Sequence, residues 1–421
     1  MKLRFWVGSM FVGAVMGAAQ PSPPPPAGSR AEPSSALATT PLLDAVARAP
    51  MMSSARARAA AARNRLGSAG RFPDPELEGM ISQVSKPTGE NPMWEINLRQ
   101  PLPKAGERAA DRERAAAVVS LAEAEYAVMA GELAADTAMA LAESEAATGR
   151  VALLARQIQR TEQTLAAVDA RVATGGGRIA DRLALQTSIA AMRLELEREE
   201  QRAADALADA RGRLGLSLDA PLPPYAAPTA PEVDIERAPT LQLAVAKGAE
   251  ARAMARMARA SGRPMTAVGL RFEREEDPMG SMDTIGIAFM TELPWRGLRY
   301  ARAEEKGAYA EVTASRAEAE AVRHRFQALL TRVQRAERLV QTARRLSGET
   351  HQRLDAEYEA LIRAAGTGSP SGGGLPVLMI LEILDRQTAT ETQVIEAEVA
   401  NRVARAELWR FAPVHLFPVN P

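Results

Sequence analysis

The sequence has 421 residues, with only 4 Trp, 5 Tyr and 8 Phe and no cysteine. The absence of cysteine excludes a disulfide scaffold and a thiolate metal site. Lys and Arg together number 52, as do Asp and Glu. This balance argues against a nucleic-acid-binding protein with a strongly positive face. So few aromatic residues are unusual in a chain long enough for two or three domains.

Residues 1–19 have the pattern of a secretory signal peptide. Two basic residues precede the apolar run Phe5–Val15, and small residues follow, with cleavage expected after Ala19. The alternative is a membrane anchor, although the run is shorter than the ~20 residues that a spanning helix needs. Residues 20–40 are rich in Pro, Ser and Ala and predict an extended or disordered lead-in. The pattern indicates a periplasmic, secreted or outer-membrane protein.

The rest of the chain contains an internal duplication. The segment Leu102–Arg108 recurs as Leu293–Arg299, and Ala49–Pro50 recurs as Ala238–Pro239. The second copy has a longer glycine-rich loop. Matching residues that follow this loop are therefore further apart in the sequence than those that precede it. We predict a first repeat at 41–220 (strands about 71–103, hairpin tip about 174–180), a linker at 221–237, a second repeat at 238–412 (strands about 263–294, hairpin tip about 364–376) and a C-terminal tail at 413–421.

Each repeat is expected to contain one very long helix, at about 108–173 and 297–363. Apolar residues recur along both helices at steps of three, four and seven, which is typical of coiled-coil packing. They are Val151, Leu154, Ile158, Leu165, Val168 and Val172 in the first helix, and Val322, Phe326, Leu329, Val333, Ala336 and Val340 in the second. At ~1.5 Å per residue, each helix is roughly 100 Å long. We therefore expect a mainly α protein with a small β part, built from thin alanine-rich helices.

Short strands are expected before each long helix, where apolar residues alternate with polar or small ones. The run from Glu76 to Ser85 is the weakest, and we predict a strand there mainly because its counterpart is one. The apolar positions are Trp94, Ile96 and Leu98 in the first repeat, and Val268, Leu270, Phe272, Ile285, Ile287 and Phe289 in the second. The pattern fits a lipid-facing barrel with interfacial aromatic residues, and equally a pair of hairpins packed on a soluble core.

With these elements in order, the sequence resembles the TolC family of outer-membrane efflux channels. The resemblance covers nearly all of residues 41–412. It depends on the duplicated helix–hairpin–long helix–turn–helix unit, on Gln100–Arg108 before the first long helix, and on Leu381–Asp385 after the second turn. The form Leu-Pro-x-x-Gly-x-Arg that begins at Leu102 is similar to the heavy-metal efflux subgroup.

The resemblance implies a homotrimer in the cell outer membrane. Each chain gives four strands to a shared twelve-stranded transmembrane β-barrel and its helices to a periplasmic tunnel. The tunnel meets a periplasmic adaptor protein, which connects it to an inner-membrane pump. Because four strands are too few to close a barrel and an open edge cannot face lipid, this interpretation requires several chains.

The same resemblance implies a periplasmic gate made of acidic residues. Glu382 and Asp385 lie three residues apart, on one helix face just after the second glycine-rich turn. Three copies of this pair form an acidic ring that favours cations. The alternative is that both are ordinary solvated positions. Asp181 is a weaker candidate, because Arg178 is close enough in sequence for a simple ion pair.

The two turns are expected to form hairpin tips that face the adaptor. Glycine is required at any such reversal of the chain, so the adaptor contact follows from the resemblance alone. The residues concerned are Gly175, Gly176 and Gly177 in the first tip, and Gly372, Gly373 and Gly374 in the longer second tip.

No residues suggest an enzyme, a cofactor or a metal site. His324, His351 and His415 are far apart, and we expect none to have a carboxylate or histidine at metal-ligand spacing. Met254 and Met257 fit packing within a helix better than soft-metal ligation. Neither glycine tract has the Gly-Lys-Ser/Thr of a phosphate loop.

The function predicted is a passive exit duct for small molecules or metal ions, powered by the pump. Two alternatives stay open. A periplasmic adaptor would have one helical hairpin flanked by compact β-domains, and the duplication argues against it. A secreted coiled-coil structural protein would need no alternating aromatic strands.

Overall fold

The computed structural model describes residues 41–86, 89–224, 228, 233–277, 280–366, 377–413 and 416. The expected signal peptide and lead-in lie outside the described residues, as does most of the expected C-terminal tail. Residues 39–421 form one compact unit, to which everything below refers.

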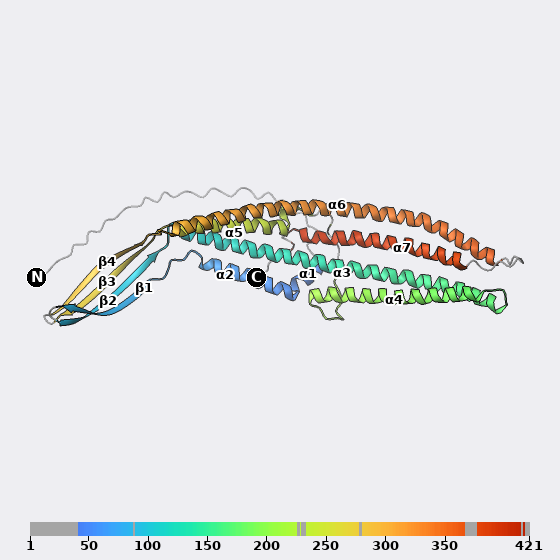
Figure 1. The fold of residues 1–421 in the computed structure, drawn as a ribbon, viewed down its shortest axis with the longest axis horizontal. Coiled ribbons are helices and arrows are strands. Elements are labelled where there is room, and N and C mark those ends of the chain that lie inside the picture. Colours follow the sequence, from blue (N-terminus) through green and yellow to red (C-terminus); the bar gives the residue numbers. More distant parts are fainter. Residues whose placement is uncertain are drawn as a thin grey trace, which may run out of the picture. The chain divides into compact units, whose positions relative to one another are not determined.

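The same order of elements occurs twice along the chain (Figure 1). The first set is α1 (Pro41–Arg48), α2 (Pro50–Ser68), β1 (Glu76–Lys86), β2 (Gly89–Leu102), α3 (Glu107–Ala173) and α4 (Ile179–Leu214). The second set is η3 (Ile235–Arg237), α5 (Pro239–Ser261), β3 (Met265–Asp277), β4 (Gly280–Glu292), α6 (Gly297–Gly366), α7 (Val377–Ala406) and η4 (Glu407–Phe411). The two long helices and the weakly predicted strand β1 are confirmed.

A break in the helix at Ala49 separates α1 from α2. Ala49 has an extended ψ of 141°, and Pro50 begins α2. Proline suits this place because its missing N–H is one that the first turn of a helix leaves without a partner anyway. α1 is therefore a separate element, and its Leu42 and Val46 side chains are buried.

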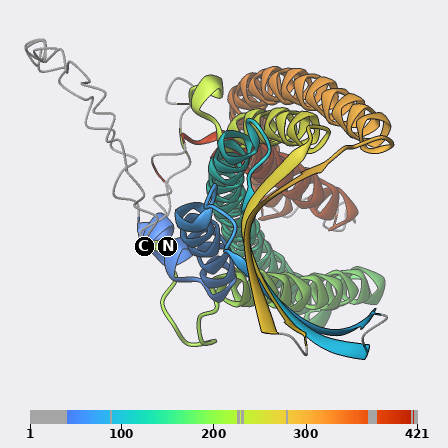
Figure 2. The ribbon, with the colours of Figure 1, turned by 90° about the vertical axis from the view of Figure 1, so that its left-hand side faces the viewer.

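Long helices run from the sheet at one end of the unit to the α3–α4 turn at the other (Figure 1). α2 and α4 follow one another along α3, while α5 and α7 follow one another along α6. Seen along the helices, these elements and the sheet line a curved wall that is open on one side (Figure 2).

The four strands form one antiparallel sheet in the order β1-β2-β3-β4. The central pair, β2 and β3, joins the two repeats, with Leu98 opposite Leu270 and Ile96 opposite Phe272. On β4, Ile287 lies opposite Leu270. Since partners across a ladder share a face, the alternating apolar residues of both repeats gather on one face of the sheet.

The apolar seam predicted along α6 is confirmed. All six of its predicted residues are buried, from Val322 to Val340. All of them except Val340 belong to a core that includes Leu408 and Phe411 at the C-terminal end, where the Phe326 and Phe411 rings lie 5.2 Å apart.

The seam predicted along α3 is partly wrong. Of its six residues only Val168 is buried, and the other five are half-buried. The buried stripe instead runs one position earlier and is mostly polar: Leu153, Gln157, Thr161, Thr164 and Val168. The reason is that α3 packs against both α4 and α7, so a wider part of its surface is covered than a single coiled-coil partner covers.

Candidate functional site

The acidic pair predicted as a gate lies in the first turns of α7. The Glu382 side chain is 59% exposed and forms an ion pair with Arg386 at 2.6 Å, one helical turn further on. Asp385 lies closer to a neighbouring helix, because the Gln157 amide nitrogen on α3 is 3.5 Å from its carboxylate. The two carboxylates therefore have different surroundings within one chain.

Partial burial raises the pKa of the Asp385 carboxyl above its usual value. The cause is desolvation of the charged form. In a ring of such pairs, repulsion between like charges would raise the carboxyl pKa as well. Within one chain, burial alone already moves the pKa in that direction.

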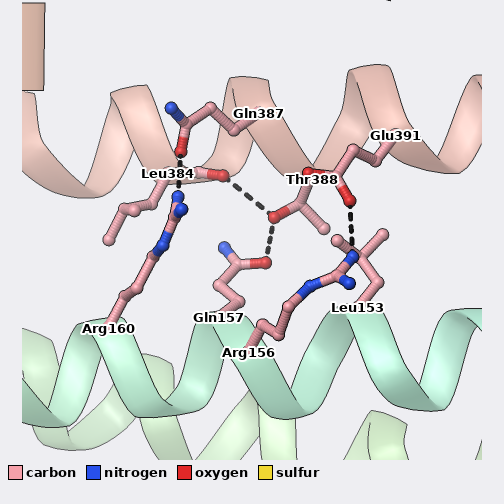
Figure 3. Close-up of a pocket in the computed structure, with 8 residues that line it drawn as sticks. All are labelled: Leu153, Arg156, Gln157, Arg160, Leu384, Gln387, Thr388 and Glu391. Carbon is pink, nitrogen blue, oxygen red and sulfur yellow. Dashed lines mark hydrogen bonds and ion pairs between the residues drawn. The ribbon is translucent and has the colours of Figure 1, made fainter. Parts of the chain in front are cut away.

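Next to this pair, α3 and α7 are joined by a network of polar side chains (Figure 3). Gln157, which is 6% exposed, accepts a hydrogen bond from the Thr388 hydroxyl. The Arg160 guanidinium donates to the Gln387 amide oxygen at 3.0 Å. These residues surround a cavity of about 30 Å³.

An ion pair extends the network toward the middle of the helices. The Arg156 guanidinium of α3 lies 2.8 Å from the Glu391 carboxylate of α7 (Figure 3). A cavity of this size and polarity has room for about one water molecule. Around this cavity, polar groups thus make most of the contact between the two helices.

The third helix of this bundle, α6, joins the network through Asp355 and His351. The Gln387 amide nitrogen donates to the Asp355 carboxylate at 2.8 Å, and Arg160 lies 3.9 Å from the same carboxylate. His351 Nε2 is 3.5 Å from Glu391 and 3.9 Å from Asp355. The expectation that His351 has no carboxylate at a ligand-like spacing is therefore wrong.

Sequence reasoning missed the polar network, although a signal was present. Gln157, Thr161 and Thr164 follow one another at steps of four and three on α3, which places them on one helix face. A polar run at this spacing, inside a stripe that otherwise predicts a buried seam, indicates a buried hydrogen-bonded contact.

Asp181, the third gate candidate, lies in the first turn of α4. An acidic side chain there interacts favourably with the N-terminal end of the helix dipole. The ion pair beside it joins Arg182 to Asp169 at 3.1 Å. One turn further on, Leu185 packs with Val377 of α7, so the starts of α4 and α7 lie at the same end of the bundle.

The first hairpin tip is a tight turn that favours glycine at Gly175 and Gly177. Gly175 has a φ of +81°, a region that favours glycine. A Cβ on Gly177 would lie 2.8 Å from the Val172 backbone nitrogen, whereas one on Gly176 would meet nothing closer than the Arg171 carbonyl at 4.0 Å. The second tip, with Gly372, Gly373 and Gly374, lies outside the described residues.

The apolar face of the sheet is exposed to solvent in the single chain. Its side chains are 74–78% exposed at Leu77, Ile285, Ile287 and Phe289. The predicted hairpins are therefore not packed on a soluble core of this chain. Exposed apolar surface of this extent marks a site of interaction with lipid or protein.

The opposite face of the sheet is polar and hydrogen-bonded. Glu95, which is only 7% exposed, accepts hydrogen bonds from Asn97 at 2.6 Å and from Arg271 at 2.9 Å. The second bond crosses from β3 to β2 and so joins the two repeats. Smaller residues, including Gly269 and Ala288, leave a hollow of about 200 Å³ on this face.

The described part of the chain lacks two kinds of feature. Among its helices, none is both long and apolar enough to cross a membrane. Its His, Asp and Glu side chains form no group of three or more that could hold a metal ion.

Comparison with known proteins gives one family match and a common fold. Residues 42–215 match the family model described as outer membrane efflux protein. No curated protein sequence matches the chain.

Three solved structures illustrate the shared fold. A membrane protein from Pseudomonas aeruginosa is 19% identical, with a TM-score of 0.67 over 88% of this chain and 92% of that one. The outer membrane protein VceC from Vibrio cholerae is 16% identical, with a TM-score of 0.67 over 88% and 95%. The MtrE outer membrane channel from Neisseria gonorrhoeae is 18% identical, with a TM-score of 0.62 over 88% of each chain. Residues 42–215 thus match the outer membrane efflux protein family, and the chain as a whole shares the fold of these three solved structures.

Proposed function

We propose that the protein is the outer-membrane channel of a tripartite efflux system. In this role it is a passive exit duct for small molecules or metal ions, and an inner-membrane pump supplies the energy through a periplasmic adaptor. The observation that carries the proposal is the match of residues 42–215 to the outer membrane efflux protein family. The choice of cargo belongs largely to the pump.

The open edges of the sheet support an assembly of several chains, and we propose a homotrimer. The outer strands of its order β1-β2-β3-β4, β1 and β4, are free to pair with further strands, and an open edge is not tolerated in lipid. Three copies give a closed barrel of twelve strands. The apolar positions of β2 span Trp94–Leu102, about the 9–11 residues that a tilted transmembrane strand needs.

The gate proposal rests on Glu382 and Asp385. Three chains bring six carboxylates to one end of the tunnel. Two unit charges ~6 Å apart repel by roughly 0.7 kcal/mol in water, and by several-fold more in a less polar medium. Such a ring attracts cations and repels anions. In the single chain, Arg386 offsets part of the charge of Glu382, so we assign Asp385 the larger share of the field.

We further assign the polar network between α3, α6 and α7 to holding the gate closed. Gln157 contacts both Asp385 and Thr388, so movement of α7 away from α3 breaks these bonds together. The ion pairs of the network, Arg156–Glu391 and Arg160–Asp355, are partly exposed to solvent. Such ion pairs each contribute little to stability. A helix held by several such bonds can therefore move when an adaptor supplies modest binding energy.

The two alternative functions are not favoured by the described structure. An adaptor has one helical hairpin, whereas α3–α4 and α6–α7 are two. A secreted coiled coil has no use for a four-stranded sheet with an exposed apolar face. We also propose that the two hairpin tips form the surface that faces the adaptor.

Cell fractionation and reconstitution test the channel proposal. The full-length protein is expected in the outer-membrane fraction as a heat-modifiable trimer. Replacing Ile287 with Lys on the apolar face should abolish this assembly, because Lys at the bilayer midplane costs ~2–4 kcal/mol. Thr284→Lys, on the opposite face of β4, is the matched control and should assemble. A wild-type protein that stays soluble in the periplasm would contradict the proposal.

Planar-bilayer recording tests the gate. Glu382→Ala and Asp385→Ala trimers should conduct more and lose cation selectivity, measured as the reversal potential in a salt gradient. Asp385→Ala should have the larger effect. Conductance and selectivity equal to the wild type in both variants would refute the gate.

A further inference from the structure

α6 and α7 are linked by two ion-pair positions at a regular spacing. Arg344 of α6 lies 2.7 Å from Glu398 of α7. Seven residues further along α6 is His351, and seven residues back along α7 is Glu391, which lie 3.5 Å apart. Because the two helices are antiparallel, the second pair is the next equivalent position along the same contact. Histidine thus occupies the place that arginine holds in the neighbouring pair.

The surroundings of His351 are set by charged groups on three helices. Asp355 of α6 and Glu391 of α7 lie within 3.9 Å of its Nε2 atom. On α3, Arg156 pairs with Glu391 at 2.8 Å and Arg160 lies 3.9 Å from Asp355. With His351 neutral, the two carboxylates and the two guanidiniums balance. Protonation adds one positive charge directly beside both carboxylates.

We propose that His351 makes the closed state of the gate depend on pH. When it is protonated, His351 forms ion pairs with Glu391 and Asp355 and ties α6 to α7 beside the α3–α7 network. When it is neutral, α7 is held to α3 by Arg156 but loses its charged contact with α6 at this position. This inference rests on the proposed channel function and specifies how its gate is regulated.

The chemistry supports histidine as the responding group. Histidine is the side chain whose charge ordinarily changes between about pH 5 and pH 8, whereas arginine stays charged throughout. The imidazole is only 26% exposed and Glu391 28%, so solvent screens this contact less than it screens a fully exposed ion pair. Arg344–Glu398 is thus a permanent link, and His351–Glu391 is a conditional one.

The test compares the wild type with His351→Arg and His351→Gln as trimers in planar bilayers at about pH 6 and about pH 8. The wild type should be open more often at the higher pH, by about two- to fivefold for the loss of one such ion pair per chain. His351→Arg should stay closed at both pH values, and His351→Gln should open readily at both. His324→Gln, at an exposed position elsewhere on α6, should behave as the wild type.

The outcomes separate this inference from the proposed function. If trimers conduct but their pH response is unchanged in both His351 variants, the inference is wrong and another group, such as Asp385, is responsible. If the wild type forms no channel, the proposed function itself fails. Should a variant conduct too poorly to record, the trimer melting temperature serves instead. The wild type should lose stability between pH 6 and pH 8 relative to His351→Arg, and an identical pH dependence would overturn the proposal.

Discussion

The two long helices perform different structural tasks although they come from one duplicated unit. α3 contacts α2, α4, α5 and α7, whereas α6 contacts mainly α5 and α7. The middle of α3 is accordingly buried on several sides, and alanine dominates it. Its fully buried alanines are Ala127, Ala134, Ala135, Ala138 and Ala142. Small side chains let several helices approach one backbone closely.

α6 buries a single stripe of larger side chains and leaves the rest of its surface exposed. Phe326, Leu329 and Val333 are buried, while Tyr300 and Leu339 are 69% and 53% exposed. The difference shows that position in the wall, rather than ancestry within the duplication, decides which residues a helix needs. A helix with neighbours on several sides uses alanine, and a helix with a free side uses a seam.

The largest expected effect comes from emptying the seam of α6. Phe326→Ala removes a ring that is 7% exposed and lies 5.2 Å from the Phe411 ring. Such truncations typically cost ~3–5 kcal/mol of unfolding free energy. The measurement is the denaturant midpoint of the protein, with Gln327→Ala, at an exposed position, as the control. A loss equal to that of the control would show that α6 does not depend on its seam.

The opposite substitution should damage α3. Ala134→Leu adds three carbons at a position with no exposed surface, and overpacking of this kind typically costs ~1–3 kcal/mol. Ala152 is exposed on the same helix, so Ala152→Leu should be nearly neutral. Thermal unfolding of the two variants compares them directly. If Ala134→Leu is tolerated as well as Ala152→Leu, α3 is not the crowded helix described above.

The seam of α6 was predictable from sequence because one packed side leaves a single periodic signal. In α3 the periodic apolar residues Leu154 and Ile158 are only half-buried, since the burial of this helix is shared among several neighbours. The periodicity of apolar residues shows how many faces of a helix are apolar. It does not show which neighbouring helix covers each face. The location of Gln157 opposite Thr388 required the fold, because 231 residues separate them.

At the candidate site too, contacts between helices could not be predicted from the sequence. The sequence predicts that Glu382 and Asp385 lie on one face of a helix. The structure places both residues on α7. Arg386 beside Glu382 was readable as an i,i+4 pair. The contact of Asp385 with α3 and the position of His351 between two carboxylates depend on contacts between helices distant in sequence.

A smaller effect on stability is expected at the first hairpin tip, and it should differ between Gly176 and Gly177. Gly177→Ala brings a methyl group to 2.7 Å from the Val172 side chain, and relief of this overlap should cost about 1 kcal/mol. Gly176→Ala meets no atom closer than 4.0 Å and should change stability less. The melting temperatures of the two variants test this. Equal values would show that the turn relaxes without strain.

The smallest effect concerns the pH dependence that Asp385 adds to α7. Burial raises the pKa of this carboxyl in the folded protein, so the folded state binds the proton more tightly than the unfolded chain does. The stabilisation is fully present below the pKa of the unfolded chain, near 4, and is lost as pH rises through the folded-state pKa.

Asp385→Asn removes the charge that burial disfavours, so it isolates this contribution. Relative to the wild type, the variant should gain unfolding free energy at neutral pH, and the gain should disappear as pH falls below about 4. Urea unfolding of both proteins across this range measures the difference. A difference that does not vary with pH would mean that Asp385 is fully solvated in the folded protein. In that case Glu382 and Asp385 would be equivalent, and the contact of Asp385 with α3 would not restrain the proposed gate.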